Sequence, residues 1–335
     1  MQEALSHERV KLQTETQPKE LLFWWVGELE FEVELNHALN GCLAHTTHSF
    51  VLQHIADSTA LTYHRPRAPE VHLAFAFPST TTWSRARSAS PQGLPQLRSA
   101  TWPWGVPNLK PEHRAAVEFD NAQLRLALEM CEILRAVDRP WILSFPEQFG
   151  STQGKPSPSP WDAHEIRLWA RTWKIWRFAL WQCELGAMRP RSTGVLANIP
   201  LSDKRFRQGW PTLSLREDGK AEYTGPLRKF CACTSGHPVA QARLAGNPWD
   251  PASLLELVKI VLLRCLDREL LSGWGRTQAA AAQGAGDSEA EDSEETVPEP
   301  ASPAPTAGLG REEPNGDPLL CDALRTLFED SSIHA

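Results

Sequence analysis

The hydrophobic and polar positions along the chain follow two kinds of pattern. Two short, almost continuous apolar runs, VHLAFAF at 71–77 and WILSF at 141–145, have the length of strands buried on both faces of a sheet. Between them, apolar residues recur at helical spacing over 112–137, which predicts a helix. Strand, loop, helix and strand form a crossover unit. We therefore predict an α/β fold with a Rossmann-like, mostly parallel sheet flanked by helices.

Other segments give coarser predictions. The stretch 21–35 indicates one or two strands, or a strand followed by the start of a helix. Over 161–186 we predict a helix, in which Trp169, Trp173 and Trp176 share one face; we interpret this stripe as core packing rather than as a platform for stacking bases. Further on we expect a short strand at 195–199, a loop with a hairpin at 205–225 and a buried helix at 251–271.

Long loops rich in proline separate these elements. The loop over 78–111 also contains many serine and tryptophan residues, and a second such loop covers 150–160. A connection of the first length is more often functional than a plain linker. Sites in open α/β sheets form outside the carboxyl ends of strands, so the start of the first loop is where we expect chemistry.

Composition divides the chain into four parts. The polar residues 1–20 are expected to be flexible, and 21–275 to form the α/β domain. Residues 276–317 hold ten acidic and two basic residues and are expected to be a disordered acidic linker; 318–335 are expected to form a short amphipathic helix. The whole chain has a net charge of −7, but 1–275 carry +3, because the last two parts carry −8 and −2. The charge therefore does not exclude nucleic acid as a partner of the domain.

Cysteine usage and the first residues predict the compartment. The seven cysteines are an odd number and are scattered, unlike a disulfide framework, and the first 20 residues lack an apolar segment typical of a signal peptide. We expect an intracellular protein, nuclear or cytoplasmic rather than secreted, with no membrane partner.

Several motifs, which follow one another in the same order as in one family, lie within residues 70–270 and resemble that family. They are HLAFAFPSTTTWSRAR at 72–87, LPQLRS at 94–99, WPWGVPNL at 102–109, Asn121, ILSFPEQFG at 142–150, WQCELGAMRPRSTGVLANIP at 181–200 and YTGPLRKFCACTSGHPVAQARLAG at 223–246. Together they resemble divergent DNA cytosine-5 methyltransferase-like domains of dinoflagellate and mobile-element proteins. The resemblance implies a methyltransferase-like sheet, S-adenosylmethionine as the cofactor and DNA as the substrate.

The residues at the catalytic positions depart from that family. The resemblance places the cysteine nucleophile at Ser79 or Thr80, and the glutamate that contacts the flipped cytosine at Ser144, with Glu147 three residues later. A hydroxyl is a much weaker nucleophile than a thiolate at neutral pH. The only glycine near the expected cofactor turn, in FWWVG at 23–27, is a weak candidate. We therefore expect no methyl transfer and no bound cofactor, or S-adenosylmethionine if the protein is active.

A capacity for binding is the property we expect to persist. Arginines in or beside the matched loops are candidates for phosphate contacts, with Trp83 beside them: Arg85, Arg87, Arg98, Arg189 and Arg191. Any one exposed arginine is more often simply solvated. Trp83, Trp102 and Trp104 are typical either of a groove that stacks bases or of a loop held rigid against the core, and both interpretations stay open.

A cysteine and histidine motif is the remaining chemical signal. Cys231, Cys233 and His237 give C-x-C-x3-H, and Cys183 is a candidate fourth ligand for zinc. The spacing is not standard, so buried thiols without a metal are the favoured interpretation.

Three functional hypotheses follow. The first is a catalytically inactive DNA cytosine-methyltransferase-like protein that binds nucleic acid or a protein, with the acidic segment 287–295 competing with nucleic acid or binding a basic partner. The second is an active methyltransferase with a hydroxyl nucleophile. The third is a non-enzymatic interaction or structural protein.

Overall fold

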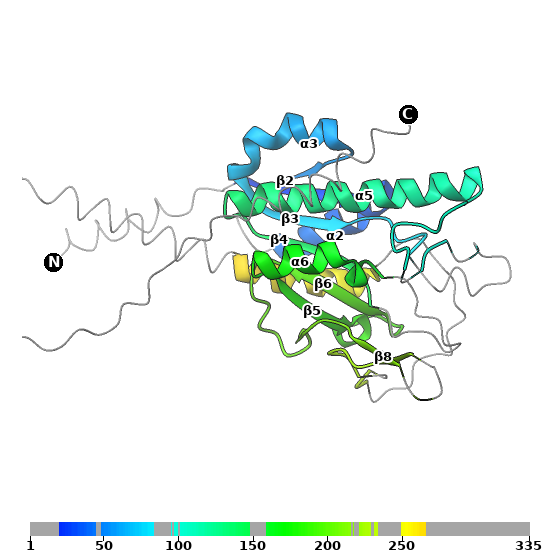
Figure 1. Ribbon diagram of the computed structural model, residues 1–335. Coiled ribbons are helices and arrows are strands. Elements are labelled where there is room, and N and C mark those ends of the chain that lie inside the picture. The colour runs from blue at the N-terminus through cyan, green and yellow to red at the C-terminus, as the bar shows by residue number, and fades with distance from the viewer. Residues whose placement is uncertain are drawn as a thin grey trace, which may run out of the picture. The chain divides into compact units, whose positions relative to one another are not determined.

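A mixed sheet of seven strands organises the part of the chain that the structure describes. The computed structural model describes residues 20–44, 48–83, 95, 97–99, 101–147, 159–215, 217, 221–228, 231–233 and 249–265. The strand order is β2-β1-β3-β4-β6-β5-β7, and β8 and β9 form a separate hairpin (Figure 1). The predicted linker 276–317 and C-terminal helix 318–335 lie outside the described residues, as does 1–20 apart from Glu20.

One half of the sheet is parallel. It consists of β1 (Glu20–Gly27), β2 (Ser49–His54), β3 (Val71–Phe77) and β4 (Trp141–Pro146). The chain passes from β1 to β2 through η1 (Leu29–Phe31) and α2 (Glu32–Leu43), and from β2 to β3 through α3 (Ser58–His64) and η2 (Arg65–Glu70). The crossover from β3 to β4 runs through α5 (Pro111–Ala136), as the apolar pattern predicts.

The other half is antiparallel. After η3 (Pro160–Asp162) and α6 (His164–Thr172), the chain forms β5 (Trp176–Trp181), η4 (Gln182–Leu185) and β6 (Ser192–Ala197). β6 lies between β4 and β5 and is antiparallel to both, and β7 (Arg207–Gln208) pairs antiparallel with β5 at the edge. The hairpin joins β8 (Leu213–Leu215) to β9 (Ala221–Tyr223). The α/β class is thus confirmed, but the sheet is mixed rather than mostly parallel.

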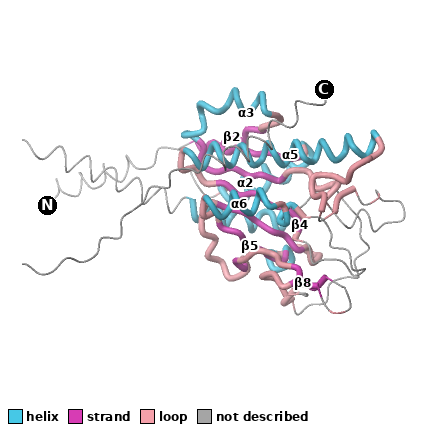
Figure 2. The backbone as a smooth tube through the Cα atoms, viewed as in Figure 1, coloured by secondary structure: helices cyan, strands magenta, loops and turns pink. Residues whose placement is uncertain are grey.

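Helices cover both faces of the sheet. On one face, α2 and the helical residues 251–265 pack on alternate strand residues such as Phe23, Phe75 and Val195. On the other face lie α5 and α6, where Trp169 of α6 stacks on Trp141 of β4 at 5.6 Å between ring centroids. Figure 2 shows the strands enclosed between these two layers. Burial of apolar side chains on both faces is the main stabilising term for such a sheet.

The prediction of one helix over 161–186, with Trp169, Trp173 and Trp176 on the same face, was wrong. The helix ends at Thr172, and Trp176 begins β5 with 37% of its surface exposed. The amide of Ile175 donates to the carbonyl of Ala170 and the amide of Lys174 to that of Arg171, with Lys174 at φ +52°. This is a Schellman motif, which ends a helix and usually contains glycine at the left-handed residue.

The remaining predictions are mostly confirmed. Strand followed by helix is the correct alternative for 21–35, and the strands at 71–77, 141–145 and 195–199 and the hairpin within 205–225 are all present. The strand β2 and the helix α3 were not predicted. Within the described ranges, none of the helices combines the length and apolar character that a membrane span needs.

Candidate functional site at the carboxyl edge of the sheet

The strands β3 and β4 end side by side, as the resemblance requires. They are parallel neighbours, with Ala76 opposite Leu143, so the loops that follow them leave the same edge of the sheet. The strand order also reverses between β1 and β3, which is where ligands bind in open α/β sheets. The two candidate catalytic segments therefore lie at the edge where a site is expected.

The hydroxyls at the nucleophile position are held in a tight turn after β3. Ser79 is 3% exposed, and its Oγ lies 3.2 Å from Oγ1 of Thr81. Thr80 is half-buried, and its carbonyl accepts a hydrogen bond from the amide of Trp83 at 3.1 Å. Among the described residues, neither hydroxyl has a hydrogen bond to a histidine or carboxylate of the kind that activates a serine or threonine nucleophile.

Ser144, at the position of the family's glutamate, has a structural contact. Its side chain is 1% exposed, and its Oγ accepts a hydrogen bond of 2.8 Å from Nε1 of Trp249. Trp249 also packs edge to face on Phe77 and directly precedes the helical residues 251–265. Ser144 thus helps to attach this helix to the sheet.

Glu147 is fully engaged with neighbouring side chains. Its Oε2 forms a buried ion pair with Arg177 of β5, and its Oε1 accepts a hydrogen bond of 2.6 Å from the hydroxyl of Tyr223 in β9. The side chains of Glu147 and Arg177 are 0% and 1% exposed. Burial and the charge of Glu147 raise the pKa of Tyr223, so the phenol stays protonated. Both oxygens of the Glu147 carboxylate are engaged by these neighbours, and the buried side chain is not exposed for contact with a nucleobase.

The arginine of this pair requires a glycine beside it. A Cβ on Gly194 of β6 would lie 2.5 Å from Nη2 of Arg177 and 2.8 Å from the ring of Trp161. Arg177 also donates 3.0 Å to the carbonyl of Gly209. Sequence analysis missed Arg177 and Tyr223. A charged residue within the apolar run WRFALW is the signal that indicates a buried partner.

Trp83 and Arg98, both candidates for nucleic-acid contacts, are buried in the structure. Both are 0% exposed, and the guanidinium of Arg98 lies 3.7 Å above the ring of Trp83. Trp83 also packs edge to face on Trp104 and Phe145. Of the two interpretations of the loop tryptophans, this arrangement favours the rigid loop for Trp83. Trp102, in contrast, is 52% exposed.

A network of hydrogen bonds attaches this loop to α5. Arg98 donates to Oγ1 of Thr82 at 2.9 and 2.7 Å and to Oδ1 of Asn121 at 2.8 Å. Thr82 donates from its amide and its hydroxyl to Oδ2 of Asp120, at 2.5 and 2.6 Å. Burial lowers the pKa of Arg98 to about 10, opposed by Asp120, so Arg98 stays charged at neutral pH. Three of the stretches that carry the resemblance thus meet in one network.

The other arginines stay candidates for phosphate contacts. Arg189 is exposed and Arg191 half-buried, and both precede β6 at the edge where β4 and β5 end. Burial lowers the pKa of Arg191, opposed by Asp250. Arg85 and Arg87 lie outside the described residues.

The glycine considered for the cofactor turn has a different explanation. Phe23, Trp24, Trp25 and Val26 form the fully buried part of β1. A Cβ on Gly27 would lie 2.9 Å from the carbonyl oxygen of Phe77, so the close approach of β1 and β3 accounts for this glycine. It does not require a ligand.

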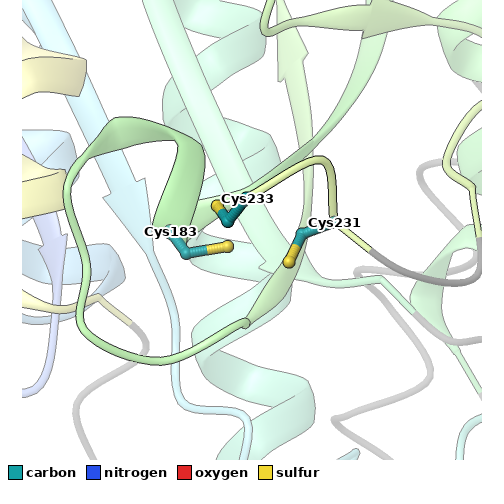
Figure 3. A group of neighbouring side chains, drawn as sticks. All are labelled: Cys183, Cys231 and Cys233. Atoms are coloured by element: carbon teal, nitrogen blue, oxygen red, sulfur yellow. The ribbon is translucent and has the colours of Figure 1, made fainter. Parts of the chain in front are cut away.

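Three of the four residues considered as metal ligands lie together, although the sequence favoured thiols without a metal. The sulfur atoms of Cys183, Cys231 and Cys233 are all within 4.8 Å of one another, and Figure 3 shows the three side chains converging from two segments. Burial, followed by the neighbouring thiols, raises the pKa of Cys183. His237 lies outside the described residues.

Comparison with known proteins adds no relative. No family model, no curated protein and no solved structure matches the chain. The arguments on function below therefore depend on the motifs and the geometry of the chain itself.

Proposed function

We propose that the chain is a degenerate DNA cytosine-5 methyltransferase-like protein that does not transfer methyl groups and binds nucleic acid at the carboxyl edge of its sheet. The first half of the sheet supports this proposal. The strands β1 to β4 run parallel with helical crossovers, and the strand order reverses between β1 and β3, as in a Rossmann-like sheet.

The convergence of the motifs is a second, independent support. Trp83, Arg98 and Asn121 belong to three separate stretches on which the resemblance depends, and all three meet in one buried network. Contact among the matched residues is what a common origin of the three stretches would lead us to expect. The ends of β3 and β4, which would carry the nucleophile and the glutamate, are also neighbours.

The loss of catalysis depends on one observation, the engagement of Glu147. This carboxylate is the nearest to the expected glutamate position, and Arg177 and Tyr223 occupy both of its oxygens in a buried site. A buried carboxylate with both oxygens engaged in this way has no free oxygen to contact the ring of a cytosine. The nucleophile position offers only hydroxyls, Ser79 and Thr80.

Methyl transfer is tested directly. The full chain is incubated with S-adenosylmethionine carrying a labelled methyl group and with duplex DNA, single-stranded DNA or RNA, and cofactor binding is measured by calorimetry. We expect no transferred label. If the unaltered chain transfers label to nucleic acid and this transfer is lost in Ser79→Ala or Thr80→Ala, the proposal is wrong and the protein is an active enzyme with a hydroxyl nucleophile.

The binding surface is argued from charge and position. Arg189 and Arg191 stand at the carboxyl edge, and residues 1–275 carry a net charge of +3. Arginine contacts phosphates through its planar fork, and each phosphate that is neutralised adds to the salt dependence of binding. DNA is the substrate that the resemblance implies, so we take nucleic acid rather than protein as the partner.

A matched pair of double variants tests this surface in the full chain. Arg189→Ala with Arg191→Ala removes two charges from the carboxyl edge. Arg65→Ala with Arg67→Ala removes two exposed charges from η2, at the opposite, amino end of β3. Fluorescence anisotropy with labelled DNA or RNA at several salt concentrations gives the affinity and its salt slope.

The expected results differ between the two variants. The first should lower the salt slope of log K by about 2, at about 0.9 for each phosphate that is no longer neutralised, and the second should leave it unchanged. An equal weakening of binding in both variants, or no binding by the unaltered chain, would contradict the proposed surface. Absence of all binding would favour the interaction or structural protein.

A further inference from the structure

We propose that Cys183, Cys231 and Cys233 bind one zinc ion, which fixes the segment 231–233 against the end of β5. The three sulfur atoms lie within 4.8 Å of one another, and none of the three cysteines is in a disulfide. A tetrahedral zinc ion with Zn–S distances of about 2.3 Å holds its sulfurs about 3.8 Å apart. Small movements of side chains therefore suffice to form the site.

Two separate segments supply the thiols, and each is held in place. Cys183 lies in η4, which ends at Gly186 in the left-handed region at φ +99°, where the glycine amide donates to the carbonyl of Cys183. Glu184 of the same turn connects it to the second segment, because its Oε1 accepts a hydrogen bond of 3.4 Å from the amide of Ala232. Arg207 fixes this carboxylate with two hydrogen bonds of 2.7 and 2.9 Å. The thiols are thus positioned by a carboxylate that is not itself a ligand.

The surroundings also suit a metal bound by sulfur. Ala179, Trp181 and Leu227 pack with Cys183 in a small apolar cluster, against which Cys231 and Cys233 lie. Thiolates are soft ligands that favour zinc over magnesium or calcium. Three of them leave one tetrahedral position for a fourth donor. This inference is independent of the proposed nucleic-acid binding.

The first experiment measures bound metal. The full chain is purified under reducing conditions from cells grown with zinc, and its metal content is determined by mass spectrometry. We expect about one zinc per chain, and a loss of at least tenfold in each of Cys183→Ser, Cys231→Ser and Cys233→Ser. The matched controls Cys42→Ser and Cys131→Ser, which remove thiols of α2 and α5 outside the cluster, should keep the full zinc content.

The second experiment identifies the ligands and separates binding from folding. Cobalt bound in place of zinc should give a sulfur-to-metal charge-transfer band in the near ultraviolet, weakened in each cysteine variant that still binds. A chelator should lower the melting temperature of the unaltered chain and leave that of Cys231→Ser unchanged. A chain without metal, equal metal in all variants, or a mass lower by two hydrogens from a disulfide within the cluster would each overturn the proposal.

Discussion

Glu147 and Arg177 form a buried ion pair, and at the scale of single residues this pair has a measurable effect on stability. Breaking a buried pair leaves one charge without a partner, which is far more costly than losing an exposed pair. We expect Arg177→Met to lower the free energy of unfolding by about 3–5 kcal/mol, because it leaves the buried carboxylate of Glu147 without its guanidinium partner. Urea denaturation of the full chain measures this change.

Two further variants control for the loss of packing. Arg67→Met breaks the ion pair with Glu70, whose side chains are 50% and 59% exposed, and should cost no more than about 1 kcal/mol. The double variant Glu147→Gln with Arg177→Met should recover part of the loss, since it leaves no buried charge. A loss below about 1 kcal/mol in Arg177→Met itself would show that Glu147 is not held as an isolated buried charge.

At the scale of elements, two helices end in the same way with different residues. α5 ends with Asp138 at φ +53° and α6 with Lys174 at φ +52°, each in a Schellman motif. In the left-handed region the Cβ of any residue approaches the neighbouring carbonyl oxygen, and aspartate tolerates this better than lysine because its short polar side chain can form local hydrogen bonds. The exposed Lys174 therefore carries local strain that glycine would not.

The replacement Lys174→Gly is expected to stabilise the chain by about 0.5–1 kcal/mol, because relief of this strain exceeds the added entropy of the unfolded chain. Thermal unfolding should show a higher melting temperature. Gly186→Ala is the opposite test, since it places a side chain at φ +99° and should destabilise. A lower melting temperature for Lys174→Gly would mean that the left-handed residue is not strained.

The same helix end shows what sequence patterns predict and what they do not. Long periodic or continuous apolar segments, such as those of α5, β3 and β4, were predicted nearly to their ends because burial alone specifies them. The end of α6 was missed because a lysine stands where glycine usually signals a stop. β2 was missed because this edge strand is only partly buried, so its pattern is weak.

The candidate site also has features that the sequence predicts and features that it does not. The sequence places Ser79, Thr80 and Ser144 at strand ends, and the convergence of three thiols follows from a motif that was noticed but not favoured. Burial of Trp83 and Arg98, and the pairing of Glu147 with Arg177, depend on residues that are distant in sequence. Such tertiary contacts leave no local pattern, because only the folded sheet brings them together.

At the scale of the whole molecule, tryptophan connects the layers of the fold. The chain has 14 tryptophans, and the following are fully buried among the described residues: Trp24, Trp25, Trp83, Trp141, Trp161, Trp169 and Trp249. Trp141 and Trp169 join β4 to α6, and Trp83 joins the carboxyl-edge loop to β4. The excess of tryptophan is thus explained mainly by packing, and the proposed nucleic-acid surface depends on arginine.

The uneven distribution of charge along the chain leads to the last prediction. Residues 287–295 contain six carboxylates, whereas residues 1–275 carry a net charge of +3. A tethered acidic segment competes with a polyanion for the same basic surface, and this competition weakens as salt screens both interactions. Replacing the six carboxylates by amides in the full chain should therefore strengthen nucleic-acid binding several-fold at low salt, with the difference disappearing at high salt. A variant with the order of 287–295 shuffled keeps the charge and should bind like the unaltered chain. If the amide variant binds no more tightly at low salt, the acidic segment does not occupy the nucleic-acid surface.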